Sequence, residues 1–394
     1  MGTLRGDYMN RADYLADPHV QEFLRWLTPM VAGAGAFPHH WWSRRFGDWS
    51  CESVFDAYER YSWPFSVTLP GETGPTRGRT FAENLEVLSR LADLLGSSAR
   101  GDDADLFLAA SIAVVDWGGV RGNRRRLQQL GADALHTITS SAEQLDPAAA
   151  DTSNLDQVID INAGFSKIYS LLLDGFPIYD SRVSAALSYL ARLYCEDTGL
   201  QTVPSALAFS LPAWRGDVRR DPSVGGLMFR RLWAGYPKRY ADSNLRAAWL
   251  LGEASHLAPI GRIPGTGALR ALESALFMIG YQVPGADQES RQSQSSRDTT
   301  DLPATSAKTD RRGRKYEPLR QWLSERQDQR VIATFSSLDD IIGGLPPSSR
   351  KYTSNWYGSA AAAPTHVWKQ AWEDAGFTVD SVDLSEGTVS FRRL

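Results

Sequence analysis

The chain has 394 residues, which is more than one ordinary domain needs, so two domains are expected. Hydrophobic residues make up 42% of the chain and aromatic residues 11%, which is enough for well-packed cores; the thirteen tryptophans serve either as core filling or as flat stacking surfaces. The net charge of -4 excludes a uniformly basic nucleic-acid-binding surface but leaves a local basic groove open.

Cysteine content and hydropathy exclude several other classes. Cys51 and Cys195 are the only cysteines, which excludes a disulfide framework and the standard zinc and iron–sulfur sites, so we expect neither a metal nor a cofactor. No apolar stretch of the sequence has the length that a bilayer requires, and residues 1–10 lack the apolar core of a signal peptide. We therefore expect a cytoplasmic protein that makes no membrane contact.

Residues 1–283 predict a mainly α domain. Leucines at three- and four-residue spacing predict an amphipathic helix over 81–95, and a uniformly apolar stretch predicts a buried helix over 105–115. The remaining predicted helices cover 158–173, 182–195, 244–254 and 268–281. The sequence Asp-Gly-Phe-Pro at 174–177 separates the first two of them. The alternation typical of strands is scarce.

Composition changes sharply after this region. Residues 284–313 contain no aromatic residue and only one large aliphatic residue, Leu302, so they predict a disordered linker. Residues 314–394 predict a small α+β domain, with Ser336 or Ser337 available as the N-cap of its second helix. Its predicted helices cover 316–325, 335–342 and 365–375, and its predicted strands cover 377–382 and 388–392, with a turn at Glu386-Gly387.

The segment from Asp160 to Tyr189 carries the most informative pattern. A turn containing Asn162 and Gly164 precedes a helix that carries Ser166 and Lys167, and after a short loop Asp180 stands directly before another helix. This order resembles the helix–hairpin–helix DNA glycosylases.

The resemblance implies a mainly α, helix–hairpin–helix glycosylase-like fold and an enzyme that hydrolyses N-glycosidic bonds in double-stranded DNA. It implies that the hairpin at Asn162, Gly164 and Ser166 binds a DNA phosphate, and that Asp180 and Lys167 are the catalytic residues. Taken with the sequences WGGVRGN and RALESALFMIGY, the segment also resembles a bacterial group linked to defence against phages. Glycosylases of that group excise hypermodified cytosines, which implies phage DNA as the partner and a roomy base pocket.

The chemistry of these residues can also be argued without the resemblance. Breaking an N-glycosidic bond develops positive charge on the sugar, which a carboxylate such as Asp180 stabilises, and the same carboxylate can orient water. A desolvated Lys167 amine could instead attack the sugar and form a Schiff base, so lyase activity stays open. The alternatives are a plain helix N-cap for Asp180 and an exposed lysine or phosphate contact for Lys167.

A segment rich in glycine and arginine follows the predicted buried helix. Glycines let the backbone approach a ligand closely, and the arginines surround it with positive charge. We expect DNA contacts from this segment, at Gly118, Gly119, Arg121, Asn123 and Arg124. We also expect a DNA contact from Arg182, which follows Asp180 closely. The alternative is a solvated helix face.

Aromatic residues are concentrated near the N-terminus. A glycosylase needs an aromatic pocket for the base that it rotates out of the duplex, and the candidate pocket residues are Trp41, Trp42, Trp63, Trp117 and Tyr179. The alternative is that most of these rings pin the N-terminal segment to the core. His39 and His40 do not predict a metal site, because adjacent residues rarely bind one ion and no carboxylates accompany them.

Three further features leave alternatives open. The pairs Arg219-Arg220 and Arg230-Arg231 are either DNA-backbone contacts or ordinary surface. Glu273 either forms an internal salt bridge or acts as a catalytic partner of Asp180. The C-terminal sequence resembles a small prokaryotic domain found alone or fused to nucleic-acid enzymes, and its candidate DNA-binding or protein-binding residues are Arg350, Lys351, Trp356, Arg392 and Arg393.

The sequence thus predicts a DNA glycosylase that flips and excises a modified base. The alternative is a non-catalytic DNA-binding or regulatory protein that uses the hairpin to bind phosphate and Asp180 only as a helix cap. A nuclease or toxin is less favoured, because no PD-(D/E)xK or HNH pattern occurs.

Overall fold

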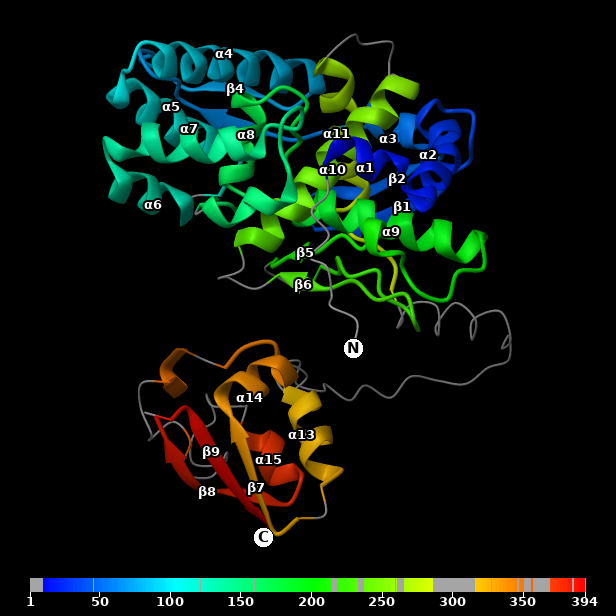
Figure 1. Cartoon of the computed structure of the whole chain (residues 1–394), viewed down its shortest axis with the longest axis vertical. Coiled ribbons are helices and arrows are strands. Elements are labelled where there is room, and N and C mark those ends of the chain that lie inside the picture. Colours follow the sequence, from blue (N-terminus) through cyan, green and yellow to red (C-terminus); the bar gives the residue numbers. More distant parts are fainter. Residues whose placement is uncertain are drawn as a thin grey trace. The chain divides into compact units, whose positions relative to one another are not determined.

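The computed structural model of the chain consists of two compact units, Met1–Thr299 and Thr300–Leu394 (Figure 1). It describes residues 10–44, 46–120, 122–158, 160–214, 218–232, 237–258, 260, 266–285, 316–326, 328–345, 347–350, 356, 369–384 and 386–393. The predicted linker over 284–313 lies outside the described residues, except for Pro284 and Gly285.

The first part of the N-terminal unit mixes short helices with two antiparallel strand pairs. Along the chain these are α1 (Arg11–Ala16), α2 (Pro18–Val31), β1 (His39–Ser43), β2 (Gly47–Cys51), α3 (Val54–Glu59), β3 (Phe65–Val67) and β4 (Thr76–Gly78). In β1 buried and exposed residues alternate, so the sequence HHWWS forms a half-buried strand that the sequence analysis missed.

The rest of this unit is mainly helical. It contains α4 (Phe81–Arg100), α5 (Ala104–Trp117), α6 (Gly122–Leu130), α7 (Asp133–Leu145), the 3₁₀ helix η1 (Thr152–Gln157), α8 (Phe165–Leu172), α9 (Ser181–Asp197), the 3₁₀ helix η2 (Ser205–Leu207), the parallel pair β5 (Leu211–Pro212) and β6 (Arg231–Leu232), α10 (Pro237–Leu257) and α11 (Thr266–Ile279). Figure 1 shows α4 and α5 side by side; α4 also packs against α8, and α11 packs against α3, α9 and α10.

Local sequence explains where these helices begin. The hydroxyl of Thr80 accepts a hydrogen bond from the Glu83 N–H, while the Glu83 carboxylate accepts one from the Thr80 N–H, which is a complete capping box for α4. Asp103 caps α5 through the N–H of Leu106. One continuous hydrophobic core joins the helices of this unit.

The prediction of a mainly α N-terminal region is confirmed. Helices occupy the predicted ranges 81–95, 105–115, 182–195 and 244–254, and α11 covers most of 268–281. The predicted helix over 158–173 is wrong in its first half. There the Oδ1 atom of Asn162 accepts hydrogen bonds from the N–H groups of Gly164 and Phe165, so α8 begins only at Phe165.

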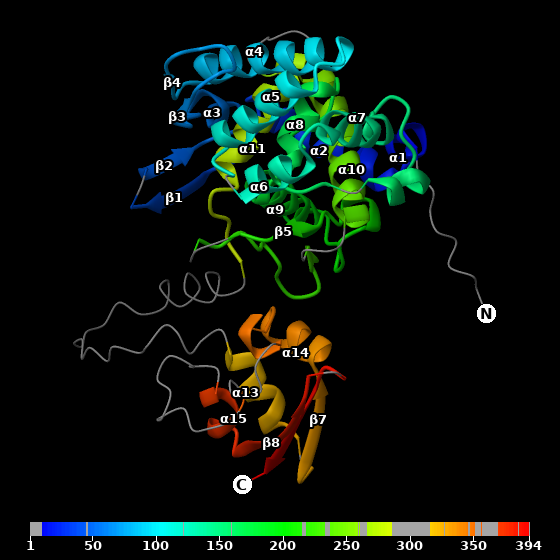
Figure 2. The same ribbon diagram turned by 90° about the vertical axis from the view of Figure 1, so that its left-hand side faces the viewer.

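The C-terminal unit is a small α+β domain, as predicted. Its elements are α13 (Glu317–Ser324), β7 (Arg330–Thr334), α14 (Phe335–Ile342), the 3₁₀ helix η5 (Pro347–Arg350), α15 (Lys369–Asp374), β8 (Phe377–Asp383) and β9 (Thr388–Arg393). The strands form an antiparallel sheet in the order β7-β9-β8. Figure 2 shows α13, α14 and α15 on one face of this sheet, and their apolar residues share its core.

Three details of this unit differ from the predictions. Strand β7 was not predicted. The N-cap of α14 is Thr334, which accepts from the Ser337 N–H, rather than Ser336 or Ser337. Within the predicted helix 365–375 the structure has α15 over Lys369–Asp374, and residues 365–368 lie outside the described residues.

Candidate functional site

A cavity of about 180 Å³ lies between α4, the end of α5, α8, the start of α9 and α11. Its walls combine aromatic rings with charged side chains from segments far apart in the sequence. The residues that line it are Tyr61, Trp63, Phe81, Asn84, Leu85, Leu88, Trp117, Gly118, Lys167, Ile178, Asp180, Ser181, Arg182, Val183, Arg220, Arg270, Glu273, Ser274 and Phe277.

Asp180 is both a helix cap and a cavity residue. Its Oδ1 atom accepts hydrogen bonds from the N–H groups of Arg182 (2.9 Å) and Val183 (3.1 Å) at the start of α9. Burial opposes ionisation of Asp180, but the charges of Lys167 and Arg182 and the two N–H groups outweigh it, so the pKa lies below its ordinary value. The carboxylate is therefore ionised at neutral pH.

Lys167 is the direct partner of this carboxylate. Its Nζ atom lies 3.4 Å from Asp180 Oδ2 and donates a hydrogen bond of 2.9 Å to the carbonyl oxygen of Ala163. The two side chains are only 5% and 13% exposed, so the alternative of an exposed lysine is wrong. A Cβ atom at Gly118 would lie 2.5 Å from Lys167 Cδ, so the end of α5 lies directly against this side chain.

A second buried ion pair lies in the same cavity. Arg270 Nη1 contacts the Glu273 carboxylate at 2.7 Å, one turn apart on α11. Glu273 Oε2 also accepts a 2.7 Å hydrogen bond from the N–H of Ile178, two residues before Asp180. Burial raises the pKa of Glu273, and the charge of Arg270 offsets this only in part. The predicted internal salt bridge of Glu273 is thus confirmed, and Glu273 also holds the segment that carries Asp180.

Tryptophan rings form a fixed aromatic wall. Trp117 Nε1 donates to Asn84 Oδ1 (2.9 Å), and Asn84 Nδ2 donates to the carbonyl oxygen of Trp63 (3.1 Å). Trp63 Nε1 donates in turn to the carbonyl oxygen of Trp117 (3.4 Å). Because the indole N–H groups of both rings donate hydrogen bonds within this wall, the faces and edges of the rings give the cavity an apolar surface.

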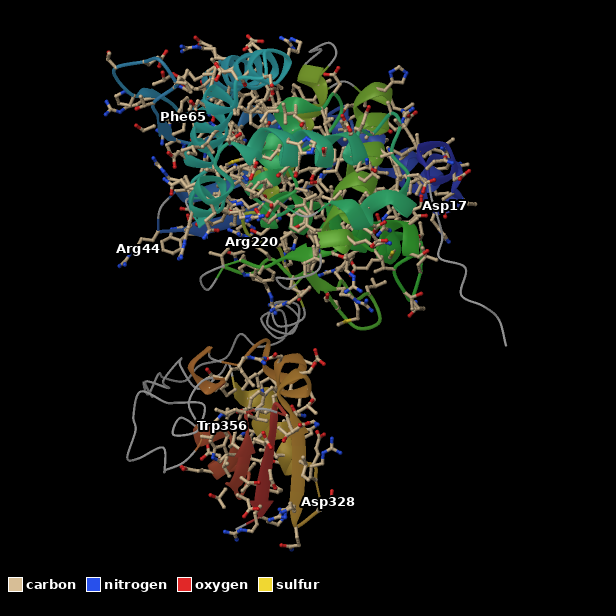
Figure 3. The ribbon with its side chains drawn as sticks, turned by 60° about the vertical axis from the view of Figure 1, so that its left-hand side comes forward. Asp17, Arg44, Phe65, Arg220, Asp328 and Trp356 are labelled. Carbon is tan, nitrogen blue, oxygen red and sulfur yellow. The ribbon has the colours of Figure 1, made fainter. Side chains whose placement is uncertain are left out.

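Arg182 and Arg220 occupy another side of the cavity. The guanidinium of Arg182 lies 4.2 Å from the ring centroid of Phe277 and 4.7 Å from that of Tyr281. Arg220 donates to Ser181 Oγ (2.6 Å) and to the carbonyl oxygen of Tyr281 (3.3 Å). In Figure 3, Arg220 lies among the side chains of the unit's interior, whereas Arg44 extends from its surface. Burial lowers the pKa of Arg220, and the charge of Asp180 opposes this.

The predicted hairpin has an internal hydrogen-bond arrangement. Its N–H groups at Gly164 and Phe165 bind Asn162 Oδ1, and the Ser166 N–H binds the Asn162 carbonyl oxygen. Asn123 also donates to Asn162 Oδ1. A DNA phosphate at this turn would have to displace Asn162, and phosphate binding here stays a prediction.

The predicted glycine- and arginine-rich segment is only partly a loop. Arg124 and Arg126 lie on α6, where they form ion pairs with Asp116 (3.0 Å) and Asp160 (2.8 Å). Gly118 lies in the cavity wall, Gly119 is exposed, and Arg121 lies outside the described residues. The pair of Arg124 and Asp116 is partly exposed, whereas Arg126 binds the largely buried Asp160 through both Nε and Nη2. DNA contact by this segment is still a prediction.

The predicted base-pocket rings separate into two groups. Trp63 and Trp117 line the cavity, but Trp41, Trp42 and Tyr179 do not. Trp41 Nε1 donates to the carbonyl oxygen of Met278 and Trp42 is 62% exposed, while the Tyr179 hydroxyl donates to the carbonyl oxygen of Ser210. For Trp41 the alternative of pinning β1 to the core is confirmed.

His39 adds to this anchoring. Its Nε2 atom lies 3.0 Å from the carbonyl oxygens of Ile279 and Gln282, next to the end of α11. In the described part of the chain, no cluster of histidine, cysteine, aspartate and glutamate side chains could hold a metal ion.

The residues of the cavity wall that sequence reasoning missed include Asn84, Arg270 and Phe277. Asn84 was hidden in the predicted amphipathic helix, where a buried polar residue among leucines is the one available signal. Arg270 and Phe277 lie on α11 at a spacing of seven residues, which places them on one face of the helix with Glu273.

One of the C-terminal candidate residues lies in the core of the C-terminal unit. Trp356 is buried and stacks on Phe335 at 5.3 Å, so it is a core residue and the prediction that it belongs to a binding face is wrong. Arg350 pairs with Asp339, Arg392 lies 3.8 Å from Asp380, and Lys351 lies outside the described residues.

Comparison with known proteins gives one match. Residues 316–394 match the model of a family described as a domain of unknown function, DUF7662. No helix–hairpin–helix glycosylase family model matches the chain. No curated protein and no solved structure matches it either. Among the described residues, no helix has both the length and the apolar character needed to cross a membrane.

Proposed function

We propose that this protein is a DNA N-glycosylase that rotates a modified base out of the duplex and excises it, in defence against phages with modified DNA. The observation that carries the proposal is the ionised carboxylate of Asp180 in an aromatic-walled cavity beside Lys167. The order of a glycine-containing turn, Lys167 on α8 and Asp180 at the start of α9 also supports it.

The geometry of Asp180 suits the stabilisation of a sugar cation. Its Oδ1 atom is fixed by two backbone N–H groups, so the position of the carboxylate is set by α9. Its Oδ2 atom lies 3.4 Å from Lys167 Nζ, longer than the roughly 2.7–2.9 Å of a tight charge-assisted hydrogen bond. Oδ2 therefore keeps the capacity to accept a hydrogen bond from water.

In the proposed reaction the C1′–N bond breaks and its electron pair leaves with the base. Asp180 stabilises the positive charge that develops on the sugar, and a water oxygen then forms the bond to C1′. The water proton passes to Asp180 Oδ2, and the departing base finally takes up a proton. No cofactor is needed for this balance.

The aromatic wall of Trp63 and Trp117 provides the surface on which a planar base stacks. The cavity volume of about 180 Å³ is smaller than the ~300–1,000 Å³ of sites for drug-sized ligands and suits a single base. It is not the roomy pocket that the resemblance implies. A second cavity of about 160 Å³ is lined in part by the same residues, Leu85, Leu88 and Arg270.

We assign Lys167 the role of charge partner of Asp180. A buried carboxylate needs such a partner, because an uncompensated buried charge costs several kcal/mol. A neutral, nucleophilic amine at Lys167 would remove this partner. Trapping with borohydride tests the alternative, because a Schiff base between Lys167 and the sugar would leave a covalent protein–DNA product.

The decisive experiment replaces Asp180 in the full-length protein. Purified protein is incubated with phage DNA that contains hypermodified cytosines and with unmodified DNA, and abasic sites are then measured. We expect abasic sites in modified DNA, and a loss of roughly two to three orders of magnitude in Asp180→Asn, because a neutral amide cannot offset the developing charge. DNA binding should persist.

The matched control is Asp17→Asn. Asp17 caps α2 through the N–H groups of His19 (2.9 Å) and Val20 (3.3 Å), which is nearly the same geometry outside the cavity. If Asp180→Asn folds poorly because Lys167 loses its partner, the double variant Asp180→Asn/Lys167→Met removes both charges. Excision by a folded Asp180 variant at the rate of the unmodified protein would disprove the proposal.

A further inference from the structure

The charges that line the cavity do not balance. Four cationic side chains face two carboxylates: Lys167, Arg182, Arg220 and Arg270 against Asp180 and Glu273. The pair of Arg270 and Glu273 is self-contained, since both carboxylate oxygens of Glu273 accept from Arg270 Nη1 and Arg270 Nη2 donates to the Ser170 carbonyl oxygen. The excess of positive charge therefore lies around Asp180.

Among the described residues that line this side of the cavity, Asp180 is the one carboxylate beside Lys167, Arg182 and Arg220. The charges of Lys167 and Arg182 lower its pKa, and its own charge raises the pKa of Arg220 against the effect of burial. Lys167 makes the direct contact, at 3.4 Å. In the described part of the cavity wall, three cations therefore face one negative charge.

Arg182 and Arg220 both lie beside the ring of Tyr281. Their guanidinium groups lie 4.7 Å and 6.0 Å from the centroid of the same ring, that of Tyr281. Ser181 Oγ and the Tyr281 carbonyl oxygen accept two of the five N–H donors of Arg220.

We propose that Arg182 and Arg220 form an anion subsite of the cavity, and that the ligand is a nucleotide with an acidic group near the base. The acidic group is either the phosphate of the extruded nucleotide or an acidic substituent of the base, because guanidinium groups bind both. This inference rests on the proposed function for the identity of the ligand as a nucleotide.

An anion at this subsite has a consequence for Asp180. It neutralises the charges of Arg182 and Arg220, which otherwise offset the carboxylate. The charge of Asp180 then acts more fully on the sugar cation. The subsite thus links recognition of the acidic group to the chemical step.

The test measures binding of free ligands by calorimetry with the full-length protein. The probes are deoxycytidine, deoxycytidine 5′-monophosphate and 5-carboxydeoxycytidine, each titrated to millimolar concentration. We expect at least one acidic probe to bind about tenfold or more tightly than deoxycytidine, and high salt to reduce this preference. A preference for the monophosphate identifies the phosphate, and a preference for the carboxy compound identifies a base substituent.

Variants test whether the two arginines cause the tighter binding of the acidic probe. Arg220→Gln and Arg182→Gln should each remove most of it, whereas Arg220→Lys, which keeps the charge, should retain part of it. Arg231→Gln is the control. Arg231 follows Arg220 in the chain and its guanidinium also lies over an aromatic ring, that of Trp214, but neither Arg231 nor Trp214 lines the cavity. Binding by this control variant should equal that of the unmodified protein.

Three results would overturn the inference: equal binding of deoxycytidine and both acidic probes, no binding of any probe, or an unchanged preference in both glutamine variants. The outcome is separable from the test of the proposed function. Asp180→Asn should keep or strengthen binding of the acidic probe, since it removes a negative charge beside the subsite. A protein that binds the acidic probe but excises no base would refute the glycosylase proposal alone.

Discussion

At the scale of single residues, one cavity holds two carboxylates whose pKa values shift in opposite directions. Both are buried, but Asp180 has the charges of Lys167 and Arg182 and two backbone N–H groups, which lower its pKa. Burial raises the pKa of Glu273, although Arg270 contacts it. Two titratable groups with separated pKa values are typical of sites with different roles for each group.

This difference predicts opposite effects of pH on two variants. A lowered pKa means that ionised Asp180 stabilises the fold above its unfolded pKa of about 3.9, and that this contribution is lost as pH falls through the folded pKa. The raised pKa of Glu273 means the reverse: its contribution is present below its unfolded pKa of about 4.3 and is lost as pH rises through the folded pKa.

The measurement is the free energy of unfolding in urea between pH 3 and pH 7. The stability advantage of the unmodified protein over Asp180→Asn should shrink between pH 5 and pH 3. Its advantage over Glu273→Gln should instead grow as pH falls from 7 to 4. Each tenfold difference in proton affinity is worth about 1.4 kcal/mol. If the stability difference changes with pH in the same direction for both variants, the pKa values of the two carboxylates do not shift in opposite directions.

Single residues also show how far sequence reasoning reaches. Both roles weighed for Asp180, as cap and as cavity residue, describe its position, because Asp before a helix is a local signal. The burial of Lys167 was not predictable, since it depends on Gly118, 49 positions away, approaching its side chain. The same limit applies to Trp41 and Trp63, which are equally aromatic but pack against different remote segments.

At the scale of elements, the crossing of α9 and α11 builds the site. Gly280, directly after α11, lies on the backbone of α9: a Cβ atom there would meet the carbonyl oxygen of Arg182 and lie 2.6 Å from its carbonyl carbon. This close approach places Phe277 and Tyr281 beside the Arg182 guanidinium. The two helices can come this close only because residue 280 has no side chain.

Gly280→Ala should therefore destabilise the N-terminal unit. The added methyl group forces α9 and α11 apart, and overpacking of this kind costs roughly 1–3 kcal/mol. The control is Gly252→Ala within α10, where nothing lies within 4 Å of a Cβ atom; it should stabilise the unit by about 0.5–1 kcal/mol. Thermal unfolding of the two variants should shift in opposite directions, and an unshifted Gly280→Ala would contradict the crossing.

The elements that were predictable share a strong local pattern. Helices α4 and α9 have apolar faces long enough to mark their type, and α5 is apolar over most of its length. Helix α4 also has the Thr80–Glu83 capping box. The turn at Asn162 and Gly164 was predicted from the resemblance, but the helix predicted over 158–173 placed the start of α8 too early. An asparagine side chain that binds two backbone N–H groups leaves no periodic signal that would mark this start. Strand β7 was missed because it has only five residues and is polar at both ends, at Arg330 and Thr334.

At the scale of the whole molecule, the two units have separate cores. The core of the N-terminal unit runs from Tyr14 to Val283 and that of the C-terminal unit from Tyr316 to Phe391, and they share no residue. All residues that line the cavity belong to the N-terminal unit. The family match covers only residues 316–394, so the cavity lies entirely outside it.

These separate cores, together with the composition of residues 284–313, predict independent folding. That stretch contains no aromatic residue, and we expect brief treatment with protease to cut within it and release two stable fragments. Each fragment should unfold in a single cooperative transition at the temperature that it shows in the full chain, because neither core depends on the other. The N-terminal fragment should also keep the full preference for the acidic probe, since every residue of the anion subsite lies before residue 284. Fragments that unfold on cleavage, or an N-terminal fragment that loses this preference, would show that the C-terminal unit contributes to the fold or the site of the first.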